Sequence, residues 1–213
     1  MYYGPLIMQK SGITISGLST DESGLVLNIP LAFSNFFGTM ICVFLIERLG
    51  RRAILLITLP IMCVCWVTAA VGMIFVGERS SETAQTVGGY TVVIAIYFFV
   101  FVFAIGLSST PWAINSEVFP LHVIGTASSL GATMNWVANA LVAEVFKLIT
   151  EISLSATVIL YIGMGCIAVG TFFFVYCLVP ETAGKPISDI LDSLLKQGYK
   201  EKEHDLLNQV KAR

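Results

Sequence analysis

Uncharged hydrogen-bonding side chains interrupt the apolar segments of this sequence. Asn35 and Asn135 supply carboxamides, and Trp112 supplies an indole. A carboxamide offers two donors and an acceptor without the cost of burying a charge, and an indole combines an apolar face with one donor. Such groups can replace the water around the hydroxyls of a neutral solute and can later release the solute. The three residues are therefore candidate binding residues.

A structural role is the alternative for the same side chains. Asparagines inside a bilayer often form hydrogen bonds with neighbouring helices. On composition alone this explanation is favoured by roughly two to one, because only a minority of intramembrane amides need contact a ligand. For Asn28 and Asn139 it is the preferred interpretation.

A cluster of charged residues forms a second candidate site. Glu47, Arg48, Arg51 and Arg52 lie within six positions, and Glu117 ends an apolar segment on the same expected face. A short charge cluster is usually a solvated turn. The alternative is an inner latch, in which Glu47 and Glu117 pair with arginines in one conformation and separate in another. We favour the latch.

Other kinds of chemistry lack support in the sequence. No Ser-His-Asp, Cys-His or metal-ligand spacing occurs, so we expect no catalytic residue, no metal and no cofactor. The five cysteines lie in apolar segments, where helix packing explains them. Because the net charge is −2 and no basic face accumulates, we also expect no nucleic-acid partner.

The composition predicts the elements that hold these residues. Hydrophobic residues make up 56% of the 213 positions and charged residues only 12%, which indicates an all-α bundle of membrane-spanning helices. Gly106 and Pro111 predict a break in the third span, since proline removes a backbone hydrogen bond. Five spans are expected: 23–46, 53–76, 91–116, 125–146 and 154–179.

The basic residues predict the orientation of these spans. Nine Lys or Arg residues fall on one side, among them Arg51 and Lys196, and three fall on the other, among them Arg79. The positive-inside rule places the nine in the cytosol. We therefore expect three regions: an outer end and loop (1–22), the membrane spans (23–179) and a cytosolic tail with a short amphipathic helix (180–213).

Three motifs occur in order along these segments: Glu47-Arg48-Leu49-Gly50-Arg51-Arg52, Pro111-Trp112-Ala113-Ile114-Asn115-Ser116-Glu117 and Pro180-Glu181-Thr182-Ala183-Gly184. Their order and spacing resemble the second half of the sugar porters of the major facilitator superfamily. The resemblance covers essentially the whole chain. It implies the carboxy-terminal six-helix half of that fold, with a partial first helix.

The resemblance also implies roles for individual residues. Asn35, Trp112 and Asn135 would contact the substrate, with Trp136 beside Asn135. Two departures remove cations from the cytosolic end: Ile124 stands where the family has an arginine, and the last motif has alanine where the family has lysine.

Tyr2 and Tyr3 match the tyrosine pair that closes the family's outer gate. An aromatic belt at the membrane interface is the alternative, and it has nearly equal weight.

Within the family, Asn115-Ser116-Glu117 looks most like the proton-coupled myo-inositol transporters. Many hexose carriers of the family have a glutamate where this chain has Ala104, which favours a cyclic polyol over glucose. The expected function is transport of a neutral polyol or sugar, with myo-inositol favoured, by alternating access.

The expected partners are that solute, the lipid bilayer of the plasma membrane and the missing amino-terminal half of the carrier. Two other functions stay open: a facilitative hexose transporter, and a non-transporting membrane sensor or regulatory fragment.

Overall fold

The computed structural model describes residues 20–77, 81–119, 123–186 and 189–190, and these residues form six helices and no strand. The expected all-α class is confirmed. Tyr2, Tyr3 and the tail from position 191 lie outside the described residues. The helices are α2 (Thr20–Leu49), α3 (Arg51–Phe75), α4 (Glu82–Ile105), α5 (Thr110–Val118), α6 (Ile124–Ile152) and α7 (Leu154–Leu178).

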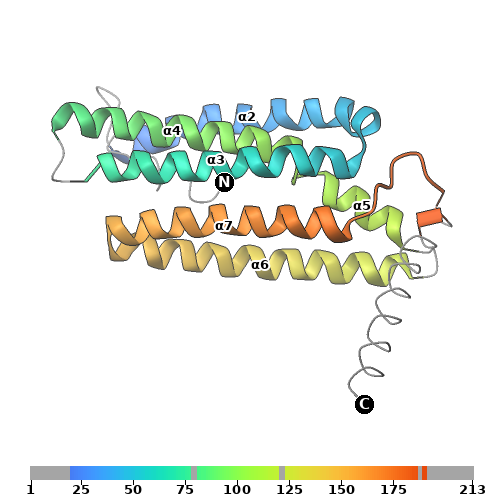
Figure 1. Ribbon diagram of the computed structural model, residues 1–213. Helices are drawn as coiled ribbons and strands as arrows, with labels where there is room; N and C mark the ends of the chain where they lie inside the picture. Colours follow the sequence, from blue (N-terminus) through green and yellow to red (C-terminus); the bar gives the residue numbers. More distant parts are fainter. Residues whose placement is uncertain (1–19, 78–80, 120–122, 187–188, 191–213) are drawn as a thin grey trace, which may run out of the picture.

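Helix α3 is the centre of the bundle (Figure 1). It packs along α4 and along α7, while α2 packs mainly on α4. Helix α6 lies at the edge beside α7, and only Phe146 and Thr150 of its residues are buried. The short helix α5 continues from the end of α4 towards α6, with which it is in contact.

Small residues bring α3 and α4 together. A Cβ added at Gly72 would lie 3.0 Å from the carbonyl oxygen of Gly88, and one added at Gly88 would lie 2.7 Å from that of Gly72. Ala69 and Ala70 of α3 are also buried. Close backbone approach at small residues is a general means of packing helices in membranes.

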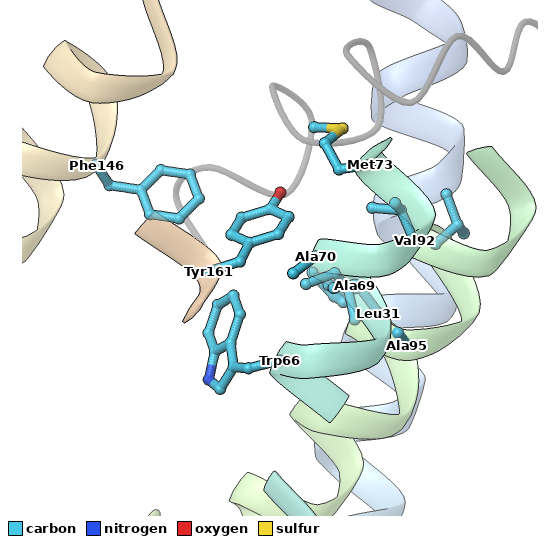
Figure 2. Packing of buried hydrophobic residues seen from close by; sticks show 11 residues of the cluster. Leu31, Trp66, Ala69, Ala70, Met73, Val92, Ala95, Phe146 and Tyr161 are labelled. Atoms are coloured by element: carbon cyan, nitrogen blue, oxygen red, sulfur yellow. The ribbon is translucent and has the colours of Figure 1, made fainter. Parts of the chain in front are cut away.

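Aromatic side chains join α7 and α6 to this pair (Figure 2). The Trp66 ring lies 5.4 Å from the Tyr161 ring of α7 and 4.7 Å from the Phe99 ring of α4, measured between centroids. Phe146 of α6 stacks on Tyr161 at 6.2 Å. Offset and tilted rings at these separations add to the stabilisation from apolar burial.

Helix α6 extends beyond the span expected from hydropathy. Helix α6 ends at Ile152, whereas the apolar run suggested an end at position 146. Hydropathy falls at Lys147 and Glu151, but the helical backbone continues until Ser153. The Ser153 hydroxyl accepts a hydrogen bond from the Ala156 amide at 3.1 Å and so caps α7.

Four segments of the described residues are long and apolar enough to cross a membrane. They are Leu25–Leu49, Arg51–Phe75, Glu82–Val118 and Leu154–Leu178. Helix α6 matches the remaining expected span but is not one of the four, because asparagines and charged residues interrupt its apolar sequence. That α6 also spans the membrane stays a prediction.

Candidate functional site

A cavity of about 540 Å³ lies where the end of α4, the helix α5 and the middle of α6 meet. None of the ten described residues that line it is charged. The polar groups come from three asparagines and one tryptophan, and the rest of the wall is apolar. The lining residues are Phe103, Leu107, Pro111, Trp112, Asn115, Gly131, Asn135, Ala138, Asn139 and Val142.

The break between α4 and α5 forms one side of this cavity. Helix α4 ends at Ile105, and α5 begins at Thr110 with Pro111 in its first turn. A proline is tolerated there because the first amides of a helix have no partner within it. Gly106 lies against Thr58 of α3, where an added Cβ would clash with the threonine side chain. The predicted break at Gly106 and Pro111 is confirmed.

One face of α6 forms the opposite side. Gly131, Asn135 and Asn139 are four residues apart and therefore lie on the same face of the helix. The Asn139 carboxamide donates a hydrogen bond to the Asn135 carbonyl at 2.9 Å. The Asn135 carboxamide forms no hydrogen bond with any other described residue, so its donors and acceptor are open to a ligand.

The cavity includes two of the four expected substrate residues. Trp112 and Asn135 line it together. Asn35 is half-buried on α2 and does not line it. Trp136 is 66% exposed and points away, because consecutive residues of a helix are about 100° apart around its axis. Substrate contact by Asn35 and Trp136 stays a prediction.

Two lining asparagines were missed or set aside at the level of sequence. The sequence favours a structural role for Asn139, and it indicates no ligand contact for Asn115 within the Pro111–Glu117 motif, yet both line the cavity. Helical spacing could have identified both, since Asn115 is three residues from Trp112 and Asn139 is four from Asn135.

The expected latch residues divide into two groups. Arg51 forms an ion pair with Glu117, with 2.7 Å between Nη2 and Oε1, and its Nη1 donates to the Ile46 carbonyl at 3.2 Å. Glu47 and Arg48 are exposed, and neither forms an ion pair with another described residue. The structure thus joins α3 to α5 through one pair, and the switching role of the set stays a prediction.

Glu181 belongs to the same charged cluster, although the sequence assigned it no partner. Its Oε1 accepts a hydrogen bond from the Arg51 amide at 2.9 Å, and its Oε2 accepts one from the Arg52 amide at 3.1 Å. The carboxylate thereby caps the positive end of α3. Gly50 has a φ of 86°, a backbone conformation that favours glycine, and a Cβ there would lie 2.6 Å from Glu181 Oε2. Glycine therefore suits both the backbone conformation and the close approach of the carboxylate.

Arg52 fixes the end of α7 to the same cluster. Its Nη2 donates to the Tyr176 carbonyl at 2.6 Å, and its guanidinium lies 5.9 Å from the centre of the Tyr176 ring. The charged cluster therefore connects α3, α5, α7 and the segment that follows α7. Within the described residues, no group of three or more His, Cys, Asp or Glu side chains could hold a metal ion.

A family model described as "Sugar (and other) transporter" matches residues 1–192. The chain belongs to this family. Among its relatives, Membrane transporter D1 of Leishmania donovani is 34% identical over 194 residues, which are 89% of this chain and 33% of that protein. Myo-inositol transporter 1 of Saccharomyces cerevisiae is 28% identical over 207 residues, or 93% of this chain and 33% of that protein.

Solved structures of the sugar transporter family show the same fold. A double-tryptophan mutant of XylE, the xylose transporter from E. coli, superposes with a TM-score of 0.67 at 23% identity. The match covers 91% of this chain and 38% of that one. The chain is therefore a multi-pass membrane protein of the major facilitator fold, and it spans about a third of the length of the curated relatives described above.

Proposed function

We propose that this chain is the carboxy-terminal part of a carrier that moves a neutral polyol, with myo-inositol as the leading substrate. The observation that carries the proposal is the uncharged cavity that is lined both by Trp112 and by Asn135, whose carboxamide forms no hydrogen bond with any other described residue. The carrier moves its solute without changing it chemically. The resemblance implies coupling to protons through a helix outside this chain.

The chemistry of the cavity suits a hydroxyl-rich ring. Carboxamides can donate to one hydroxyl and accept from another, and an indole covers the less polar face of a ring. Because no ion pair forms with the solute, binding remains weak enough for release. The yeast relative named as a myo-inositol transporter adds support for this substrate.

Alternating access would use the charged cluster at one end of the bundle. The Arg51–Glu117 pair ties α5, which carries Trp112, to α3. If this pair separates when the carrier opens inward, α5 is free to move and the cavity changes shape. We place this end, and the tail, in the cytosol and the protein in the plasma membrane.

Substrate competition in a grafted carrier tests the proposal. Residues 1–192 would replace the matching third of the yeast myo-inositol transporter, in cells that take up no inositol of their own. We expect saturable uptake of labelled myo-inositol, with unlabelled inositol competing better than glucose. Equal competition by glucose would favour the hexose carrier, and a folded graft without uptake of either solute would contradict a transport role.

A further inference from the structure

Asn115 lies on the cavity wall, although the resemblance implies no contact with the substrate for it. It is three residues after Trp112 on the nine-residue helix α5, so both side chains lie on the same face. The break at Gly106 turns this face towards α6. Asn115 and Trp112 therefore approach the cavity together from one side, while Asn135 approaches it from the other.

A glycine on α6 makes room for the Asn115 carboxamide. A Cβ added at Gly131 would lie 3.1 Å from Asn115 Nδ2 and 3.7 Å from both Cγ and Oδ1. A separation of 3.1 Å is tighter than ordinary packing, so even alanine at position 131 would push the carboxamide aside. The absence of a side chain at Gly131 therefore lets the Asn115 amide pack closely against α6 at the cavity wall.

The hydrogen-bonding groups of Asn115 are not used by the protein itself. Its carboxamide forms no hydrogen bond with another residue in the described part of the chain. The neighbouring Ser116 differs, since its hydroxyl donates to the Ala113 carbonyl at 2.8 Å. Asn139 also differs, because its amide donates to the backbone of α6. A purely structural asparagine would be expected to form a bond of this kind.

We propose that Asn115 is a further specificity-determining residue, which contacts one hydroxyl of the ring and selects polyols that carry a hydroxyl at that position. The inference rests on the proposed function, because it assigns a ligand contact within the same cavity. Trp112 and Asn135 hold the ring between two helices. Asn115 forms a hydrogen bond with the ring hydroxyl on the side nearest Gly131. A ring without that hydroxyl would leave the amide without a partner.

Single-deoxy analogues of myo-inositol test this contact in the grafted carrier. Competition constants would be measured for the unaltered graft, for Asn115→Leu and for Asn115→Asp. We expect one analogue to bind the unaltered graft roughly 2- to 12-fold more weakly than inositol through loss of a hydrogen bond to Asn115. In Asn115→Leu, inositol should weaken by the same factor while that analogue is unaffected, so the difference between them disappears.

The conservative variants keep the test decisive. Asn115→Asp retains the size of the side chain and its acceptor, so it should fold even if Asn115→Leu does not, and it should change the ratio for the same analogue. Ser116→Ala, one residue along α5, is the matched control and should leave every ratio unchanged. Gly131→Ala should reduce discrimination against the same analogue, because it displaces the carboxamide.

The experiment distinguishes failure of the Asn115 proposal from failure of the proposed function. If both Asn115 variants keep the inositol-to-analogue ratios of the unaltered graft while Trp112→Ala weakens binding, Asn115 does not contact the ligand and the proposed function stands. If neither Trp112→Ala nor Asn135→Ala changes binding, the cavity is not the substrate site and both proposals fall.

Discussion

Trp112 and Asn135 come from different helices and meet at one cavity, so their loss should affect binding more than folding. We expect Trp112→Ala and Asn135→Ala to weaken substrate binding at unchanged amounts of protein in the membrane. Each lost hydrogen bond should cost about 0.5–1.5 kcal/mol. Uptake kinetics of the grafted carrier, normalised to surface expression, would measure this cost.

Trp136→Ala provides the control for these variants. Trp136 adjoins Asn135 but points away from the cavity, so its removal should change the affinity less than the removal of Trp112. Equal losses in the two tryptophan variants would show that the resemblance assigns Trp136 correctly and that the cavity is not the full site.

Ala104 shows how packing limits a comparison between members of one family. The glutamate of many hexose carriers would replace a side chain that is fully buried, and a Cβ at Gly38 of α2 would lie 2.7 Å from the Ala104 Cβ. A glutamate there would have to extend from a position where α2 and α4 are in close contact. Ala104→Glu would therefore change the packing of α2 on α4 as well as the choice of substrate. The competition between inositol and glucose tests the substrate without changing this packing.

At the scale of elements, Gly106 maintains the junction of α4, α5 and α3. We expect Gly106→Ala to destabilise the chain by about 1–3 kcal/mol, because the new methyl group collides with Thr58. Gly125→Ala is the matched control, since nothing lies within 4 Å of a Cβ at that position. Thermal unfolding in detergent would compare the two, and equal midpoints would contradict the close approach at Gly106.

Glu181 should stabilise the start of α3. Its replacement by alanine removes two hydrogen bonds to the Arg51 and Arg52 amides, which we expect to cost about 1–2 kcal/mol. Glu47→Ala removes an exposed carboxylate from the same region and should change the stability by no more than about 0.5 kcal/mol. Denaturant titration of both variants measures the difference, and a smaller loss for Glu181→Ala would contradict the cap.

The sequence predicts local features of these elements better than contacts between them. Gly106 and Pro111 act on their own backbone, so the break in the third span was predictable. The Glu181 cap joins residues about 130 positions apart, and no local pattern specifies that distance. The cavity depends on both kinds of information. Helical spacing places Asn115 on the same face of α5 as Trp112, but only the contact between α5 and α6 brings this face to the same cavity as Asn135.

For the whole molecule, the orientation in the membrane is a prediction from the distribution of charge. The nine-to-three distribution of basic residues predicts a cytosolic tail, and the Glu181 contacts place the start of that tail beside the turn between α2 and α3. We expect a cysteine introduced at position 196 to react with impermeant thiol reagents only after cells are permeabilised. Labelling at that position in intact cells would reverse the orientation.

We propose that this chain supplies one side of a polyol site whose other side lies elsewhere in the carrier. Substrate sites of such carriers lie between two halves, and here the amide face of α6 is open.

The decisive experiment uses a graft in which residues 1–192 replace the matching carboxy-terminal part of XylE. The graft is reconstituted into liposomes, and the uptake of labelled myo-inositol is measured. We expect saturable uptake by the graft, less uptake by its Trp112→Ala variant, and none by unaltered XylE or by the 213-residue chain alone. Saturable uptake by the chain alone, or a folded graft that transports xylose but no inositol, would contradict this proposal.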